Sequence, residues 1–358
     1  MPAHFSRFIA TLILDIAYGY QVNTDDDALV DLGEATTHNI ALAGSAGSIT
    51  GDINSCKQRL YCMLVDFLPF LKHYPTWLPG SAWKKHIEYT AVMVEKMQTV
   101  PYNTVKSSLV CLHLALCLRA LIERCLTGNE MTDRYAENEK DIRGVATSLY
   151  AAGTETVATT MQVFILAMLI YPDVLVKAQE EMDHVIGSGR LPELYDRENL
   201  PYLNAIIKET YSCEGGTLLF LLKCSIVILS SGLIFASRGM SRDEGIYSDS
   251  EAFLPERFMN KEEALDPKSF VFGFGRRLCP GREFADTCIF MVLSNIVATM
   301  DILRAKDERG NEITPQAIFT DGLASRPARL DCVLKPRTQQ ARDLILLQDT
   351  NDTTFSAQ

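Results

Sequence analysis

The pattern of apolar and polar positions predicts that helices dominate this chain of 358 residues. Apolar side chains recur at helical spacing in several segments, and Pro or Gly residues mark where most of these segments end. The predicted helices cover residues 8–20, 63–71, 141–171, 172–186, a short stretch from Pro201, and 281–300. No comparable period extends over the segments between them, which are expected to be loops.

Strands are expected in two places only, and both are short. Residues 225–229 (SIVIL) and 330–334 (LDCVL) have the composition of strands, whereas residues 251–280 are rich in Pro, Gly and Phe and follow neither period. The expected fold class is therefore mainly α with a small β component, as a single domain over residues 1–340. Residues 341–358 are expected to form a disordered polar tail.

Composition narrows the function classes. The formal net charge of −11 provides no basic surplus to replace phosphate counterions, so no nucleic-acid partner is expected. The sequence has 10 cysteines without a C-x-x-C pair and 6 histidines without an H-E-x-x-H pattern, which argues against a structural zinc site. Cys111, His113 and Cys117 lie on an apolar stretch and are interpreted as core residues rather than ligands.

One cysteine has different surroundings. The segment FVFGFGRRLCPGREF, residues 270–284, places Cys279 between a loop rich in Gly and Arg and the first turn of a predicted helix. The unpaired N–H groups of a helix N-terminus favour an ionised sulfur, and Pro280 suits an early helix position. The glycines let the backbone approach a flat ligand, and Arg277 is suited to bind a carboxylate. These features suit a thiolate ligand of haem iron.

Two other interpretations of this segment are a dinucleotide-binding loop and an inert buried cysteine. The first requires G-x-G-x-x-G after a strand, but Leu278 stands at the third glycine position and no strong strand precedes it. The second is left open by the local residues.

A second candidate site lies upstream, in LYAAGTETVATTMQ, residues 149–162. Gly153 stands inside a predicted helix, where Gly costs about 1 kcal/mol relative to Ala and therefore calls for a reason. A hydroxyl beside it, such as that of Thr156, can bond back to the preceding turn, bend the helix and open a groove for water or oxygen. Glu155 would then supply a carboxylate for proton transfer. A packing face of small residues with an exposed acid is the alternative.

The segment around Cys279, residues 270–284, resembles the haem-binding signature of the cytochrome P-450 family, Phe-x-x-Gly-x-Arg-x-Cys-x-Gly, at every fixed position. The matching residues are Phe272, Gly275, Arg277, Cys279 and Gly281. In that family the cysteine is the proximal iron ligand and the arginine contacts a haem propionate. The resemblance therefore implies that Cys279 is the metal ligand and that the matching residues bind the cofactor.

Further segments extend the resemblance to most of residues 8–336. AAGTET is similar to the oxygen-activation motif of the family, which implies catalytic roles for Glu155 and Thr156. Glu209 resembles the glutamate of the Glu-x-x-Arg element, and Arg257 in PERF resembles the arginine that joins it. Other stretches resemble fungal members of the secondary-metabolism type, close to aflatoxin-pathway oxidoreductases.

The resemblance implies a monooxygenase that uses heme b, O2 and an apolar organic substrate. Electrons would come from NADPH through a reductase. Lys268, Arg276 and Arg282 are candidates for a basic docking patch, and a solvated charged loop is the alternative. It also implies membrane association at the endoplasmic reticulum surface. The implied fold is a cytochrome P-450 fold that lacks the N-terminal helices and much of the main sheet. A non-catalytic relative that cannot hold haem firmly is the alternative, and a helical scaffold is a third class.

The match departs from the family between Tyr211 and about Gly239. Ser212 stands where the family has the arginine of Glu-x-x-Arg, so the usual network of one glutamate and two arginines lacks a cation. The same interval contains residues 217–236, which are apolar enough to span a bilayer. A buried strand and an altered splice junction are the other interpretations, and the last is preferred.

Overall fold

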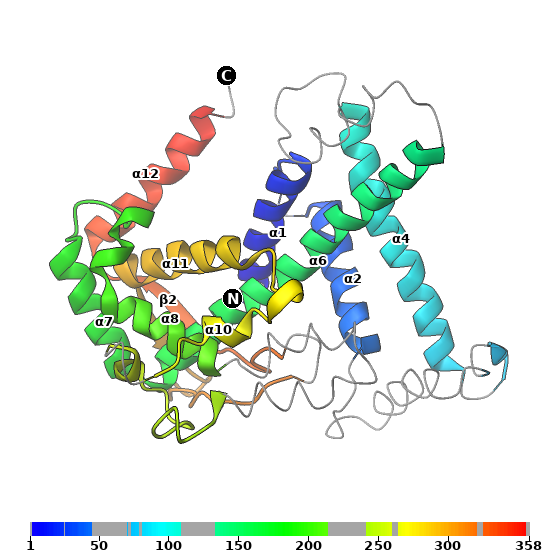
Figure 1. The fold of residues 1–358 in the computed structure, drawn as a ribbon. Helices are drawn as coiled ribbons and strands as arrows, with labels where there is room; N and C mark the ends of the chain where they lie inside the picture. The colour runs from blue at the N-terminus through cyan, green and yellow to red at the C-terminus, as the bar shows by residue number, and fades with distance from the viewer. Residues whose placement is uncertain are drawn as a thin grey trace. The chain divides into compact units, whose positions relative to one another are not determined.

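The computed structural model describes residues 2–24, 26–44, 70, 73–78, 81–108, 133–213, 241–259, 264–320 and 325–355 (Figure 1). Contacts group the chain into two compact units. The N-terminal unit is built mainly from residues 2–158, and the C-terminal unit mainly from residues 159–320 and 325–358. The division falls within the long helix α6 (Asp133–Ile170).

The N-terminal unit contains the first part of α6 and three further described helices, α1 (Pro2–Tyr18), α2 (Ala28–Gly44) and α4 (Ala82–Ser108). α1 buries Ile9, Ile13 and Ala17 because their spacing puts them on one face. Asp27 caps α2, since its Oδ1 accepts the N–H groups of Leu29 and Val30 at 2.8 and 3.3 Å. α2 then packs along α4.

The C-terminal unit contains most of the short elements of the chain. Its described elements after α6 are α7 (Pro172–Val185), η2 (Leu194–Asn199), α8 (Pro201–Cys213), η4 (Pro255–Phe258), α10 (Lys268–Val271), η5 (Gly275–Arg277), α11 (Arg282–Thr299), β1 (Met300–Arg304), β2 (Cys332–Pro336) and α12 (Gln339–Phe355). α7, α8 and α11 pack on one another. Ile206 of α8 and Phe290 of α11 are fully buried in the resulting core.

A small antiparallel sheet closes this unit. β1 follows α11 directly and pairs with β2, so that Met300 lies opposite Pro336 and Arg304 opposite Cys332. Arg304 also donates to the carbonyl of Leu169 at 3.2 Å, which ties the sheet to the end of α6. The sheet therefore fixes where the chain goes after α11.

Most elements that the sequence predicts are confirmed. The helices at residues 8–20, 141–171, 172–186, near Pro201 and 281–300 correspond to α1, α6, α7, α8 and α11, and the strand at residues 330–334 corresponds to β2. The mainly α class with a small β component is confirmed as well, while the single domain over residues 1–340 stays a prediction. Other predictions fall largely or wholly outside the described residues, namely those on residues 63–71, 110–120, 217–236 and 225–229.

Three details differ from the sequence predictions. Met300, expected at the end of a helix, adopts an extended backbone and begins β1. α2 and α4 were not predicted. The tail expected to be disordered from residue 341 instead forms α12 as far as Phe355, and Thr338 Oγ1 caps this helix by accepting the N–H of Ala341 at 3.0 Å.

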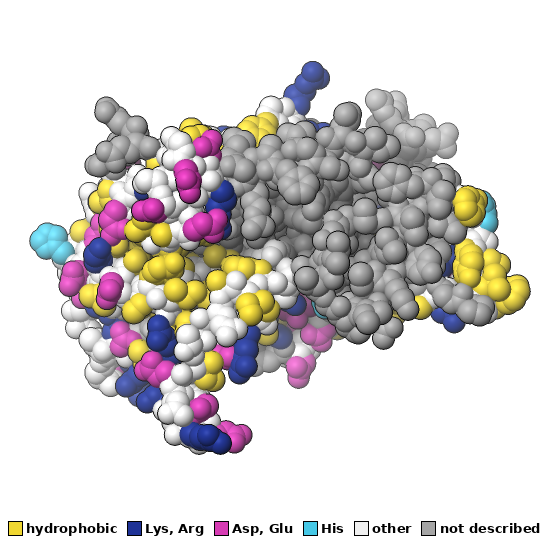
Figure 2. All heavy atoms as spheres, turned by 90° about the horizontal axis from the view of Figure 1, so that it is seen from below, with side chains coloured by type: hydrophobic (Ala, Val, Ile, Leu, Met, Phe, Trp, Pro, Cys, Tyr) yellow, Lys and Arg dark blue, Asp and Glu magenta, His cyan; other side chains and the backbone are white. Residues whose placement is uncertain are grey.

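Within the described ranges, one helical segment, Glu139–Ile170, is long and apolar enough to cross a membrane. In the structure 78% of its apolar window is buried, as in a core helix. On the described part of the face drawn in Figure 2, basic and acidic side chains are interspersed.

Candidate functional site

Cys279 lies on the segment that joins α10 to α11, residues 272–281, called here the Cys279 loop. Its base is anchored, because the Phe272 side chain is buried and the Phe272 carbonyl accepts the N–H of Cys279 at 2.8 Å. Gly273 and Gly275 have φ angles of 83° and 56°, which strain other residues. The glycines thus let the chain leave the core after Phe272 and return at Cys279.

The thiol of Cys279 is free and partly exposed. A β-carbon on Gly281 would lie 3.9 Å from the Cys279 sulfur, so the glycine keeps the space beside the sulfur open. α11 begins at Arg282 with Gly281 as its N-cap, and the N–H groups of its first turn favour a thiolate nearby. The prediction for Pro280 is wrong: it precedes the N-cap and lies in the turn rather than in the helix.

Arg277 lies on the exposed part of the Cys279 loop. Its guanidinium forms no hydrogen bond or ion pair with any residue that the structure describes, so its donors are available to a ligand carboxylate. An accessible sulfur, an open space and an uncommitted guanidinium on one loop fit a haem group. All five predicted cofactor residues belong to this loop.

A partly buried ionic cluster lies beside the loop. Asp286, on α11, accepts from Lys268 Nζ at 2.6 Å, from Tyr211 at 3.1 Å, and from Arg197 Nη2 at 3.1 Å. Arg197 Nη1 lies 2.9 Å from the second carboxylate oxygen. Burial acts to raise the pKa of Asp286, but the hydrogen bonds from Arg197 and Lys268 outweigh it and hold the pKa below its ordinary value.

The pairing that the resemblance implies between Glu209 and Arg257 is confirmed. Arg257 Nε lies 3.1 Å from Glu209 Oε2, and both side chains are buried. The contact is not aligned as a hydrogen bond, so Oε2 has no hydrogen-bond donor among the described residues. Glu209 Oε1 accepts the N–H of Leu254 at 3.1 Å. Burial raises the pKa of Glu209 to about 7, although the charge of Arg257 opposes this.

The residues predicted for proton transfer lie on the part of α6 that belongs to the N-terminal unit. Thr156 Oγ1 donates to the carbonyl of Ala152 at 2.7 Å, which confirms the predicted bond to the preceding turn. Glu155 is partly exposed. Gly153 also has a packing reason, because a β-carbon there would lie 2.7 Å from Ile13 Cδ1 of α1. The glycine therefore permits a close approach between α1 and α6.

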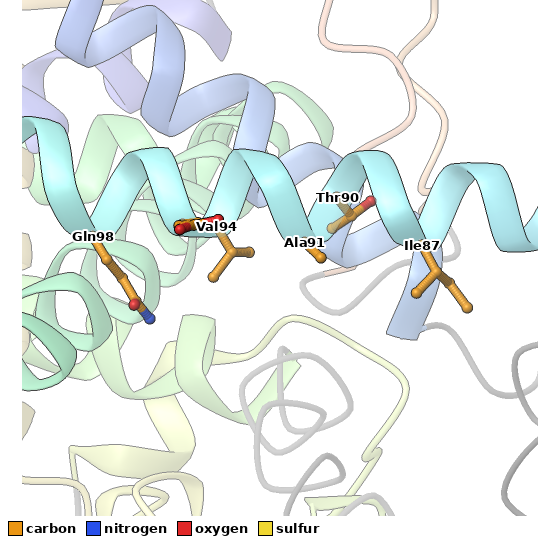
Figure 3. A pocket seen from close by; sticks show the side chains of 6 residues that line it. Ile87, Thr90, Ala91, Val94 and Gln98 are labelled. Carbon is orange, nitrogen blue, oxygen red and sulfur yellow. The ribbon is translucent and has the colours of Figure 1, made fainter. Parts of the chain in front are cut away.

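A shallow groove also lies in the N-terminal unit, along α4. Figure 3 shows Ile87, Ala91, Val94 and Gln98 projecting from one side of this helix, and Thr90 and Glu95 complete the lining. None of the residues predicted to be functional contributes to it. The groove is an open helix face and not a site with convergent polar groups.

The sequence reasoning missed Asp286, Arg197 and Tyr211 as parts of the site. They come from separate elements, α11, η2 and α8, so no local spacing links them. One signal was present: Asp286 is the last charged residue of α11 before its mainly apolar remainder, a few residues after Cys279. A carboxylate that is largely removed from water at this position needs hydrogen-bond donors around it.

The sequence profile of the Cytochrome P-450 family matches residues 1–211 and 231–328. The profile is interrupted at residues 212–230, inside the interval where the family resemblance was expected to break. That the interval comes from altered splicing stays a hypothesis.

Several fungal proteins are similar to this chain. It is 36% identical to cytochrome P-450 monooxygenase 176 of Postia placenta, over 96% of this chain and 65% of the relative. It is 35% identical to monooxygenase 136 of the same fungus, over 98% of this chain and 66% of the relative. It is 33% identical to the monooxygenase CLM2 of Gibberella zeae, over 96% of this chain and 64% of the relative. The chain thus spans just under two thirds of the length of these relatives, and the narrower resemblance to aflatoxin-pathway enzymes stays a prediction.

Proposed function

Because the chain belongs to the cytochrome P-450 family, we propose that it is a haem-dependent monooxygenase, which inserts one atom of O2 into an apolar organic substrate. The observation that carries the proposal is the free, partly exposed thiol of Cys279 on a loop that is anchored at its base. The similarity to proteins named monooxygenases supports it.

In this proposal heme b is held by the Cys279 loop. Cys279 supplies the axial thiolate, Arg277 binds a haem carboxylate, and Gly281 leaves room beside the sulfur. Haem with a thiolate ligand supplies the electron donation that favours cleavage of the O–O bond. Phe272 and Gly275 shape the backbone that presents these groups.

Glu155 and Thr156 are proposed to deliver protons. The Thr156 hydroxyl uses its hydrogen on the Ala152 carbonyl, so it would act toward a water as an acceptor. That water would keep a hydrogen free to donate toward the reacting oxygen, and the Glu155 carboxyl would resupply the proton. Thr156→Val keeps the shape but removes this acceptor, and it should uncouple consumption of NADPH from product formation.

Electrons are proposed to come from NADPH through a reductase that docks near the Cys279 loop. Of the three basic residues predicted for this surface, Lys268 is bound to Asp286 and Arg282 to Glu283 at 3.0 Å. Arg276 has neither a hydrogen bond nor an ion pair within the described part of the chain. Arg276 is therefore the cation best placed to attract an acidic partner. The endoplasmic reticulum membrane surface is proposed as the location.

The decisive experiment is a spectrum of the reduced, carbon-monoxide-bound protein from cells supplied with a haem precursor. A Soret band at the position of a thiolate complex is expected for the unchanged chain and lost in Cys279→Ala. Cys288→Ala is the matched control, because this buried cysteine on α11 has a pKa raised to about 11 by burial and stays a thiol. Absence of bound haem in the unchanged chain would overturn the proposal.

A second candidate is a non-catalytic relative that keeps the loop but does not retain haem. It is favoured by Glu209, whose Oε2 lacks a hydrogen-bond donor among the described residues, and by Ser212 at the position of the family arginine. The same spectrum separates the two candidates, because a non-catalytic relative would lose haem during purification. Turnover of NADPH with a reductase then tests the enzyme directly.

A further inference from the structure

The cluster around Asp286 joins the two ends of the Cys279 loop. Lys268 is the first residue of α10, which leads into Phe272, whereas Asp286 lies on α11, which leaves from Gly281. The ion pair between Lys268 and Asp286, at 2.6 Å, therefore bridges the two helices that flank the loop, α10 and α11, which are called here its stem. Arg197 of η2 binds both oxygens of the same carboxylate and holds it in one orientation.

A second connection leads from Asp286 to Cys279 itself. Tyr211 donates its hydroxyl to Asp286 at 3.1 Å, and its ring meets the Phe272 ring edge-on at a centroid distance of 5.7 Å. The Phe272 carbonyl in turn accepts the N–H of Cys279. Movement of Asp286 would therefore be transmitted to the residue that holds Cys279.

We propose that Asp286 is a positioning residue for Cys279, which closes the stem of the Cys279 loop and so fixes where the sulfur lies. Its role for haem rests on the proposed function, but the effect on the loop does not. The side chain of Asp286 is only 13% exposed and is bound by two cations and a hydroxyl. Without its charge, Arg197 and Lys268 would face each other as like charges, and the stem would open.

The test is Asp286→Asn in the full chain, with hydrogen exchange of individual amides as the readout. Loss of charge-assisted hydrogen bonds should speed exchange of the Cys279 and Leu278 N–H groups roughly tenfold to a hundredfold. Tyr211→Phe removes only the hydroxyl and should speed the same amides severalfold, so it also serves if Asp286→Asn does not fold. Unchanged exchange at Cys279 in both variants would overturn the proposal.

Asp183→Asn is the matched control. Asp183 of α7 binds both Nη atoms of Arg337, at 2.9 and 2.7 Å, and is therefore also an aspartate held by an arginine fork. No hydrogen bond or ion pair joins it to the described Cys279 loop, so its loss should leave the Cys279 amide unchanged. Equal acceleration in Asp183→Asn and Asp286→Asn would show a general loss of stability and would count against positioning.

The spectrum of the reduced, carbon-monoxide-bound protein adds a readout at the sulfur itself, and comparison with Asp183→Asn separates it from general destabilisation. In Asp286→Asn a larger fraction of bound haem should lack the thiolate band, whereas Asp183→Asn should match the unchanged chain. If the unchanged chain binds no haem while Asp286→Asn still speeds exchange at Cys279, the proposed function fails and the positioning role stands. If thiolate-bound haem and exchange are both unaffected by Asp286→Asn, the proposed function stands and the positioning role fails.

Discussion

Asp286 and Glu209 are two carboxylates of the C-terminal unit with cations beside them, but the Asp286 side chain is 13% exposed and the Glu209 side chain 3%, and their pKa values shift in opposite directions. Asp286 receives hydrogen bonds from Arg197, Lys268 and Tyr211, and its pKa is lowered. Glu209 has an arginine 3.1 Å away, but its pKa is raised to about 7. The carboxylate that receives several directed donors, lies beside two cations and keeps some solvent exposure is the one whose charged form is stabilised.

The reason lies in how Arg257 uses its donors. Its Nε donates to the carbonyl of Leu254 at 3.2 Å and its Nη2 to the carbonyls of Asp249 and Ala252 at 3.0 and 2.8 Å. Its Nη1 donates to the carbonyl of Ser248. Each nitrogen of the guanidinium therefore donates to a backbone carbonyl, and its contact with Glu209 Oε2 is poorly aligned for a hydrogen bond.

The largest effect on stability is expected from removing the arginine partner of Glu209. Arg257→Leu would leave Glu209 as an unpaired buried charge, and this should cost about 3–5 kcal/mol in the free energy of unfolding at pH 8. Urea denaturation measures the cost. Arg337→Leu is the control, because its partner Asp183 is 56% exposed and the loss should stay within about 1 kcal/mol. Equal losses in the two variants would contradict the importance of burial.

The next effect is on pH dependence. The folded chain keeps a proton on Glu209 up to about pH 7, while the unfolded chain releases it near 4.5, so raising the pH through this window should destabilise the fold. The loss should approach about 3 kcal/mol between the two ends of the window. Denaturation at several pH values measures it, and the difference between the unchanged chain and Glu209→Gln isolates this group. A difference that is constant across the window would refute the assignment.

A smaller gain is expected from supplying the missing donor. Ser212 is buried on α8 and follows Glu209 by one helical turn, so Ser212→Arg would bring a guanidinium to the face that carries Oε2. Above pH 7 the variant should be more stable by about 1–2 kcal/mol, and its dependence on pH should flatten. Ser212→Gln, which adds a longer side chain with donors but no charge, is the control. A less stable Ser212→Arg with an unchanged pH slope would mean that the larger side chain does not fit.

Sequence reasoning recovered the parts of the molecule that depend on local pattern. Apolar spacing with Pro and Gly boundaries predicted α7 and α8, and a contiguous motif singled out the loop that carries Cys279 and Arg277, whose roles stay predictions. It missed β1, because Met300 continues the apolar run of α11 and only pairing with β2 makes it a strand. It also placed Pro280 in the helix, whereas the turn at Cys279 delays the start of α11.

The Asp286 cluster could not be predicted from the sequence for a related reason. Its members lie on four elements that tertiary packing brings together, and each is unremarkable in its own segment. The pairing of Glu209 with Arg257 was predicted from the family resemblance, but the misaligned contact was not. Its geometry depends on backbone carbonyls that no side-chain pattern reveals.

Arg257 has a consequence for how the preceding segment can vary in evolution. One side chain collects the carbonyls of Ser248, Asp249, Ala252 and Leu254, all of which are backbone groups that every amino acid carries. Exchanging exposed side chains in residues 248–254 would leave those acceptors in place, except at Asp249, whose φ angle of 51° restricts which residues fit. Inserting or deleting one residue would shift several of them out of reach together. The segment should therefore tolerate substitutions but not insertions or deletions.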